Sequence, residues 1–211
     1  ITQDAIPVNN RWLENLTKDL SNPEIAGVYG KQIPKNNANP MERFFLSQFY
    51  PEKTEIKYSH QNAKDIFFSN VNSAIKKGIW KKHKFSSDLI MSEDQEWAKR
   101  VISQGYKLVY EPKAGVYHSH NYSLKTVFQR YFDSGASLKD FASEEYRSST
   151  FLSEGVRYFK DEIKFLYTHG YKKWIPYAII YDFCKFSGMF LGKKEKYIPT
   201  AIKKRLSLHR V

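Results

Sequence analysis

Apolar residues recur along this chain at two spacings, and the two spacings predict different secondary structure. The segments 7–20 and 41–50 carry apolar side chains at helical spacing, whereas Ile25 to Ile33 is a short apolar run that predicts a strand. From Leu124 onward the pattern is helical almost to the end of the chain. Breaks in these C-terminal helices are expected at glycines and prolines, namely Gly135, Gly170, Pro176, Gly188, Gly192 and Pro199.

A further helix is predicted from residue 93 to about residue 104. Ser92 and Gln95 have the spacing of a capping box, with the serine as the N-cap and the glutamine at the third helical position. Gly105 suits the left-handed residue that often follows a helix. The helix therefore begins with two carboxylates, Glu93 and Asp94, in its first turn.

Two short β segments are predicted next, at 106–110 and 114–120, and Pro112 separates them. Successive side chains of a strand point to opposite faces, so residues two apart share a face. We therefore expect His118 and His120 to point the same way.

Composition indicates a folded chain of about one domain with an extension. The 211 residues are 41% hydrophobic and 16% aromatic, which excludes a disordered protein. The single cysteine, Cys184, excludes an internal disulfide, and a reducing, cytosolic location is the simplest interpretation. The chain begins with Ile1 and has neither an initiator methionine nor a signal sequence, so we interpret it as a fragment.

The net charge of +12 predicts an anionic partner, such as a nucleotide phosphate, a lipid headgroup or a nucleic acid. Residues 157–211 contain 13 Lys and Arg against 4 Asp and Glu, so most of the excess is in the C-terminal tail. A nucleic-acid module would instead interleave its basic residues with stacking aromatic residues on one recognition surface. The charge pattern therefore disfavours nucleic acid.

The acidic pair Glu93 and Asp94 has two interpretations. Carboxylates in the first turn stabilise a helix, because the N-terminal end carries partial positive charge. The same position holds an ionised carboxylate at a defined point, as a general base requires when it takes a proton from a sugar hydroxyl.

The histidine pair also has two interpretations. Two imidazoles on one strand face, together with the carboxylate of Asp4, could bind Mg²⁺ or Mn²⁺, and mixed oxygen and nitrogen ligands suit Mn²⁺ somewhat better. Neighbouring histidines on an exposed strand are also common by chance. No motif of a serine nucleophile and no glycine-rich phosphate loop occurs in the sequence.

Taken in order, four sequence elements resemble family 2 glycosyltransferases of the GT-A fold, and the resemblance covers essentially the whole chain. They stand where that family has its metal-binding Asp-x-Asp element, its acceptor-side segment, its Glu-Asp motif and its Pro-x-Ala-x-Val-x-His strand. In this chain they are Thr2 to Ala5, Ile66 to Lys77, Ser92 to Arg100 and Pro112 to His118. The strings 117–122 and 130–135 are similar to the rhamnosyltransferase-like branch in particular.

The resemblance implies a role for each candidate residue. Asp94 would be the base of an inverting, single-displacement transfer, and Glu93 would position the base or the acceptor. Asp4 and His118 would bind the divalent cation on the donor diphosphate, with His120 compensating for a carboxylate that the Asp-x-Asp element lacks. The remaining candidates are Gln3 for the donor, and Asn70, Ser73 and Arg130 for the acceptor.

The resemblance also implies an α/β architecture, a partial GT-A (Rossmann-like) domain. Residues 1–145 would form the acceptor-side half, and residues 146–211 a basic, aromatic-rich helical extension. The sugar-nucleotide-binding half would be missing, so the fragment is expected to be inactive alone. The implied function is transfer of a sugar, with rhamnose a candidate, from a nucleotide-diphosphate sugar to a glycan or lipid-linked acceptor in bacterial cell-surface polysaccharide synthesis.

Two alternatives lie outside catalysis. In one, the chain is a non-enzymatic membrane-surface module, in which aromatic and aliphatic residues between Trp174 and Phe190 form an interfacial face. Lys172, Lys173, Lys185, Lys193 and Lys194 would flank that face. The rival interpretation of the same residues is a helix packed on the domain, and for the enzyme itself the expected location is the cytoplasm, at the inner face of the cell membrane. In the other alternative, the basic tail binds nucleic acid. Binding to liposomes or to random DNA, compared at two salt concentrations, separates them.

Overall fold

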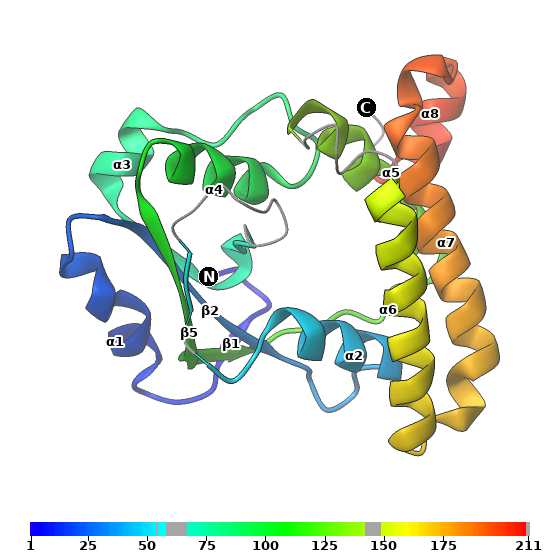
Figure 1. Ribbon diagram of the computed structural model, residues 1–211, viewed down its shortest axis with the longest axis horizontal. Helices are drawn as coiled ribbons and strands as arrows, with labels where there is room; N and C mark the ends of the chain where they lie inside the picture. The colour runs from blue at the N-terminus through cyan, green and yellow to red at the C-terminus, as the bar shows by residue number, and fades with distance from the viewer. Residues whose placement is uncertain (54, 58–66, 142–148, 210–211) are drawn as a thin grey trace. The chain divides into compact units, whose positions relative to one another are not determined.

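A computed structural model describes residues 1–53, 55–57, 67–141 and 149–209 of the chain (Figure 1). The chain divides into two compact units. The first comprises Ile1–Ser86 and Glu93–His120, and the second comprises Ser87–Ser92 and Asn121–Val211. The boundary expected between residues 145 and 146, and Ile66 at the start of the expected acceptor-side segment, lie outside the described residues.

The first unit is built on a five-stranded sheet with the order β1-β5-β2-β4, and β3 also pairs with β5. The two long strands, β2 and β5, are parallel, and every other pairing is antiparallel. The strands are β1 (Ile6–Pro7), β2 (Ile25–Ile33), β3 (Glu55–Lys57), β4 (Ser73–Ile75) and β5 (Lys107–Tyr117). The strand predicted at 25–33 is therefore confirmed.

Helices cover both faces of β2 and β5. Tyr29 and Tyr110 pack in one apolar cluster with residues of α2 (Pro40–Phe49) and α4 (Glu93–Ser103). Their neighbours Val28 and Val109 pack in a second cluster with residues of α1 (Trp12–Thr17). The described residues of this unit also contain three shorter elements, the 3-10 turns Lys18–Ser21 and Asn70–Asn72 and the helix α3 (Lys77–Lys82). The mixed α/β class expected from the sequence is confirmed.

The two β segments expected around Pro112 form one strand, β5. Gly30 pairs with Glu111 and Gln32 pairs with Val116, so four residues of β5 bulge out between these two pairs. The bulge accommodates the proline within the strand, because proline cannot donate to a regular ladder. The expected end of the strand is also wrong, since β5 ends at Tyr117, before both histidines.

Helix α4 begins where the sequence predicts, but without the predicted capping box. Ser92 has a left-handed φ of 65°, whereas an N-cap residue normally has extended backbone. The side-chain amide of Gln95 donates to the carbonyl of Phe68 instead of returning to Ser92. At the other end, Gly105 has a φ of 86° and ends the helix as expected.

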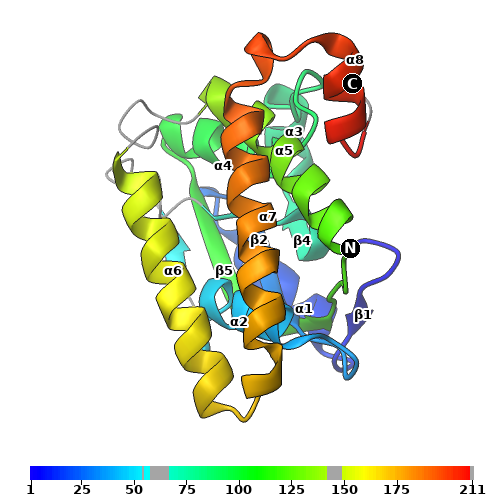
Figure 2. The ribbon, with the colours of Figure 1, turned by 90° about the vertical axis from the view of Figure 1, so that its right-hand side faces the viewer.

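From Asn121 onward, the described residues of the second unit form helices joined by turns and short loops. Figure 2 shows α7 running between α5 and α6, with α8 near the C-terminal end. The four helices are α5 (Leu124–Phe141), α6 (Ser149–Thr168), α7 (Ile175–Lys193) and α8 (Thr200–Leu206). Two short 3-10 turns, Lys172–Trp174 and Glu195–Tyr197, precede and follow α7.

Several of the expected helix breaks are wrong. Gly135 lies inside α5, and Gly188 and Gly192 lie inside α7. A Cβ atom at any of the three would collide with the backbone of the facing helix, so these glycines allow α5 and α7 to pack closely. Pro176 begins α7 in the first turn, where its missing N–H has no helical partner anyway. The chain does turn at Gly170, with a φ of 80°, and before α8.

Candidate active site

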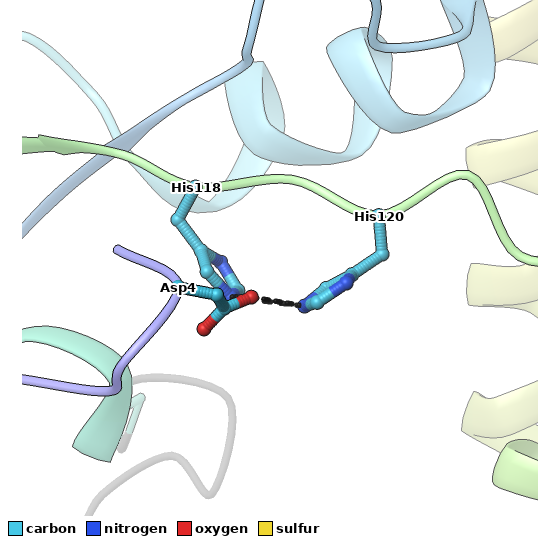
Figure 3. Close-up of side chains that lie close together, drawn as sticks. All are labelled: Asp4, His118 and His120. Carbon is cyan, nitrogen blue, oxygen red and sulfur yellow. Dashed lines mark hydrogen bonds and ion pairs between the residues drawn. The ribbon is translucent and has the colours of Figure 1, made fainter. Parts of the chain in front are cut away.

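Two segments that are far apart in the sequence bring three potential metal ligands together (Figure 3). Asp4 lies just before β1, and His118 and His120 lie in the segment that follows β5. Ile6 of β1 is opposite Tyr117 of β5 in an antiparallel pair, so the residues before β1 meet those after β5. One ligand atom from each of the three side chains lies within 4.8 Å of the others.

These side chains contact one another through the atoms that would bind a cation. Asp4 Oδ2 lies 3.3 Å from Nε2 of His118 and 3.3 Å from Nε2 of His120. The two Nε2 atoms are 3.0 Å apart. One carboxylate oxygen and two imidazole nitrogens converging in this way suit a divalent transition-metal cation such as Mn²⁺.

The environment of His118 keeps its imidazole neutral, which is the form that binds a metal. Burial and, to a smaller extent, the neighbouring His120 lower the pKa of His118 to about 4, although the carboxylate of Asp4 opposes the shift. The backbone N–H of His118 donates to the carbonyl of Ile33, which fixes the residue beside the end of β2.

Gln32 on β2 sets which nitrogen of His118 carries the hydrogen. The distance from its Oε1 to Nδ1 of His118 is 2.7 Å, and a carbonyl oxygen can only accept. The side-chain nitrogen of Gln32 donates to the hydroxyls of Tyr50 and Ser69, which orients the amide. Nδ1 of His118 is therefore protonated, and the lone pair of Nε2 faces Asp4.

The candidate base lies at the start of α4 and is held by a neighbouring turn. Asp94 Oδ2 accepts from the backbone N–H of Asn70 at 3.1 Å, and Oδ1 accepts from the N–H of Gln95 at 2.9 Å. The side-chain nitrogen of Asn70 is 3.4 Å from Oε1 of Glu93, so one residue contacts both carboxylates. Burial raises the pKa of Asp94 to about 6, and the charge of Glu93 contributes to the increase.

The same turn also connects the base to the metal-ligand cluster. Asn70 belongs to the 3-10 turn Asn70–Asn72, which directly precedes β4. The carbonyl of Val71 in this turn accepts from the backbone N–H of Thr2 at 2.9 Å, two residues before Asp4. The carboxylate at the start of α4 and the segment carrying Asp4 are therefore attached to consecutive residues of one turn.

The remaining candidates occupy different positions. Gln3 is exposed beside Asp4, and Ser73 begins β4 opposite Tyr29. Arg130 belongs to α5 of the second unit, where its guanidinium lies 4.7 Å from the ring centre of Tyr122. The structure therefore groups Asp4 with the two histidines, and Glu93 and Asp94 with Asn70.

Sequence reasoning assigned no role to two residues that organise this site, Gln32 and Asn72, although Asn72 belongs to the run of polar residues 69–73 that is typical of a site. Asn72 is buried, and its amide donates to the carbonyl of Ala114 at 2.7 Å and accepts from the indole of Trp12 at 2.8 Å. It therefore stabilises the bulge that precedes the histidines. The available signal was a polar side chain within or beside an apolar strand, which must find a hydrogen-bond partner when buried.

Comparison with known proteins identifies two relatives. One is the O-antigen chain rhamnosyltransferase RfbN of Salmonella typhimurium, and the other is the O-antigen chain rhamnosyltransferase WbaN of Salmonella anatum. Each is 33% identical to this chain over 217 aligned positions, which cover 100% of the chain and 68% of the relative. Neither a family model nor a solved structure matches the chain.

Proposed function

This chain belongs to the rhamnosyltransferase-like glycosyltransferases of polysaccharide synthesis, and we propose that it catalyses an inverting transfer as a family 2 enzyme. The observation that carries the proposal is the turn Asn70–Asn72. It holds the Asp94 carboxylate through one N–H and the segment before Asp4 through one carbonyl. A base for the acceptor and ligands for a cation on the donor are thereby attached to one element.

In this proposal, Asp94 acts on the acceptor hydroxyl. Its carboxylate takes the proton as the O–H bond breaks, and the oxygen's electron pair forms the new bond to the anomeric carbon. The bond from that carbon to the diphosphate oxygen breaks, and its electron pair leaves with the diphosphate. Attack opposite the leaving group inverts the anomeric centre. A pKa of about 6 keeps the base ionised at neutral pH while making it a better proton acceptor than an exposed aspartate.

Asp4, His118 and His120 would bind the divalent cation, Mg²⁺ or Mn²⁺. The three side chains fit such an ion, because their ligand atoms converge and His118 presents a lone pair at Nε2. A cation here supplies charge neutralisation to the departing diphosphate. Glu93 shares Asn70 with Asp94, so its role would be to position that residue and the acceptor.

We propose that the donor is a nucleotide-diphosphate sugar, with rhamnose as a candidate, and that the acceptor is a glycan or a lipid-linked glycan. Gln3 would contact the donor, while Asn70, Ser73 and Arg130 would contact the acceptor. The enzyme would work in the cytoplasm, at the inner face of the cell membrane. The chain covers 68% of each relative. We propose that residues corresponding to the unmatched part of the relatives complete the donor site.

The test, in the complete enzyme, is Asp94→Asn, which preserves the shape of the side chain and one of its two hydrogen bonds from backbone N–H groups but removes proton acceptance. Turnover should fall by roughly 10²–10⁴-fold, with donor affinity nearly unchanged. In the unsubstituted enzyme, kcat/KM should rise with pH through about 6 as Asp94 ionises, and this rise should be absent from the residual activity of the variant. Asp88→Asn, a surface substitution on the loop before α4, is the matched control.

An Asp94→Asn enzyme within a few-fold of the original, with the same pH profile, would reassign these carboxylates to helix capping. Retention of the anomeric configuration in the product would contradict the single displacement. Loss of donor binding in parallel with turnover would place Asp94 in the donor site instead.

A further inference from the structure

Helix α7 has a buried side and, opposite it, an exposed side with large apolar residues. One side packs within the second unit through buried residues that recur at helical spacing: Ala178, Tyr181, Asp182, Lys185, Gly188 and Gly192. The other side carries Ile179, Ile180, Phe183 and Phe190, which also share a face at helical spacing. The exposed fractions of these four residues are 49%, 50%, 70% and 52%. A row of large exposed apolar side chains on one helix marks an interaction surface.

Exposed lysines and an exposed aromatic side chain lie at both ends of α7. Exposed Lys172 and Lys173 precede α7 together with Trp174. Exposed Lys194 and Lys196 follow it. Tyr197 beside them is 75% exposed. The arrangement is an apolar centre between two cationic, aromatic ends.

The acidic residues of the same stretch do not offset this charge. Between residues 172 and 197 they are Asp182, which is buried 3.2 Å from Lys185, and Glu195, which pairs with Lys203 at 2.7 Å. Lys185, which the sequence suggested as part of an interfacial basic face, is therefore inside the unit and is excluded from it. The outward charge of the helix ends is positive.

We propose that this face of α7, comprising the four exposed apolar residues and the lysines at both ends, binds the surface of an anionic lipid bilayer. The helix would lie parallel to the membrane, with the apolar side chains at the boundary of headgroups and acyl chains and the lysines among anionic headgroups. In the residues that the structure describes, no helix is long and apolar enough to cross a membrane. This membrane contact would explain the location that we propose for the enzyme, at the inner face of the cell membrane. It does not depend on the proposed transfer reaction.

Charge favours a membrane over the other candidate occupants of this face. Because both ends of α7 are positive, pairing with a second copy brings lysines together in either a parallel or an antiparallel arrangement. A nucleic acid would contact the lysines but would leave the central aliphatic and aromatic side chains without a partner. An anionic bilayer satisfies the charge at the ends and the apolar centre at once.

The experiment is co-sedimentation of the 211-residue chain with vesicles of phosphatidylcholine, with or without about one-third phosphatidylglycerol. Binding should require the anionic lipid and weaken as salt rises, because exposed charges are screened. The double variant Ile180→Ser and Phe183→Ser should lower binding roughly tenfold or more. Replacing Lys172, Lys173 and Lys194 by Gln should lower binding and remove most of its salt dependence.

The matched control is Leu13→Ser, which removes an equally exposed apolar side chain, 57% exposed, from α1 of the first unit. It should sediment like the original chain, and circular dichroism should show that all variants are folded. The proposal is overturned if the double variant binds vesicles as well as the control, or if the original chain does not bind. A concentration-dependent dimer that Phe183→Ser abolishes would assign the face to a second copy, and salt-sensitive binding to random DNA without vesicle binding would assign the lysines to nucleic acid.

This outcome is separable from that of the proposed reaction. The substituted residues of α7 include none of Asp4, Asp94 and His118. Transfer to a water-soluble acceptor should therefore be unchanged in the double variant. An unsubstituted enzyme that binds vesicles but transfers no sugar would count against the proposed reaction alone.

Discussion

Gln32 is the residue on which the metal-binding form of His118 depends. Its carbonyl oxygen accepts from Nδ1 at 2.7 Å and leaves the lone pair of Nε2 directed at Asp4 and His120. Such contacts behind a metal ligand fix the ring orientation and the position of the hydrogen, and their loss typically weakens metal binding 10–100-fold. Gln32 touches no ligand atom of the proposed cation, so its role would be positioning.

Gln32→Leu should therefore weaken Mn²⁺ binding by about 10–100-fold. Gln32→Glu should largely restore the affinity, because a carboxylate also accepts from Nδ1 and the hydroxyls of Tyr50 and Ser69 can turn to donate to it. The measurement is a titration of the purified chain with Mn²⁺, followed by the loss of the free-ion electron paramagnetic resonance signal.

Gln104→Leu serves as the control, because Gln104 is exposed after α4. Equal affinity in Gln32→Leu and in this control would show that the tautomer of His118 is set elsewhere. Loss of binding in both Gln32 variants would indicate that the amide nitrogen, rather than the oxygen, is what the site requires.

At the scale of single residues, the sequence was most informative for site residues that can be recognised from their neighbours in the chain. Asp94 and Glu93 were located because they begin a helix that the apolar spacing predicts, and His118 and His120 because they are two residues apart. Gln32 could not be assigned in this way. Its partners are 18, 37 and 86 residues away along the chain, and only the sheet register brings them together.

At the scale of elements, α5 and α7 of the second unit approach each other closely at three glycines. Gly188 and Gly192 of α7 face the carbonyls of Phe128 and Phe132, and Gly135 of α5 faces the carbonyl of Met189. A methyl group at these positions would meet backbone, which cannot move aside as a flexible side chain can. The helices therefore depend on glycine for their separation, although glycine is a poor helix former.

Gly188→Ala should destabilise the protein by about 1–3 kcal/mol. The free energy lost when the new Cβ pushes α5 and α7 apart should exceed the free energy gained from the higher helix propensity of alanine. Gly78→Ala is the matched control. It also lies in a helix, α3, but a Cβ there has nothing within 4 Å, so it should be neutral or stabilise by up to about 1 kcal/mol. The measurement is urea unfolding followed by circular dichroism. A Gly188→Ala protein as stable as Gly78→Ala would mean that α5 and α7 are less closely packed.

Buried charge is a second feature that joins α6 to α7. Glu162 of α6 has both carboxylate oxygens buried next to Asp182 of α7. Lys185 lies 3.2 Å from Asp182 and donates to the hydroxyl of Tyr158 at 3.2 Å, and its Nζ is 5.8 Å from the ring centre of Tyr131. One cation thus faces two carboxylates. Burial raises the pKa of Glu162 to about 8, with Lys185 opposing the shift and Asp182 adding to it.

The folded protein should therefore lose stability as pH rises from about 4.5 to about 8. Over that range Glu162 keeps its proton when folded but loses it when unfolded, where its pKa returns to the usual 4.5. The free energy of unfolding should fall by at most about 1.4 kcal/mol per pH unit from this group. Glu162→Gln, which is neutral at every pH, should remove that part of the slope. Urea midpoints measured between pH 5 and 8 are the test.

Asp161→Asn controls for the loss of a carboxyl group, because Asp161 is an exposed neighbour on α6. Its urea midpoints should keep the slope of the unsubstituted protein. If Glu162→Gln keeps that slope as well, Glu162 ionises in the folded state at its ordinary pKa.

Helices α5 and α7 show why the secondary structure was only partly predictable from the sequence. Apolar spacing located the helical region from Leu124, but glycines were interpreted as breaks because local propensity disfavours them. Their actual role is set by a neighbour more than 50 residues away, as in the pair Gly192 and Phe132. Pro112 misled for the same reason, since the pairing of β5 with β2 accommodates it in a bulge.

At the scale of the whole molecule, the chain is two compact units with different chemistry. The first contains the partial glycosyltransferase sheet with Asp4, Asp94 and the histidines, and the second contains the helices α5 to α8. The boundary expected between residues 145 and 146 stays a prediction, and the compact units divide at another point, between His120 and Asn121. Neither composition nor spacing marks that point, because no linker-like sequence occurs there.

If the cation binds only in the first unit, Mn²⁺ should stabilise the two units unequally. At a Mn²⁺ concentration of about 100 times its dissociation constant, binding should stabilise the folded first unit by about 2.7 kcal/mol relative to its unfolded state. Amide hydrogens that exchange only when the first unit unfolds should then exchange about 100-fold more slowly. Hydrogen exchange followed by mass spectrometry should show this slowing in β2 and β5, with little change in the α7 segment 175–193. Asp4→Ala should abolish the effect, whereas Asp19→Asn, a surface carboxylate of the same unit, should keep it. Equal slowing in β5 and α7 would show that the two units open together, and slowing in the Asp4→Ala protein would place the cation outside the cluster of Asp4, His118 and His120.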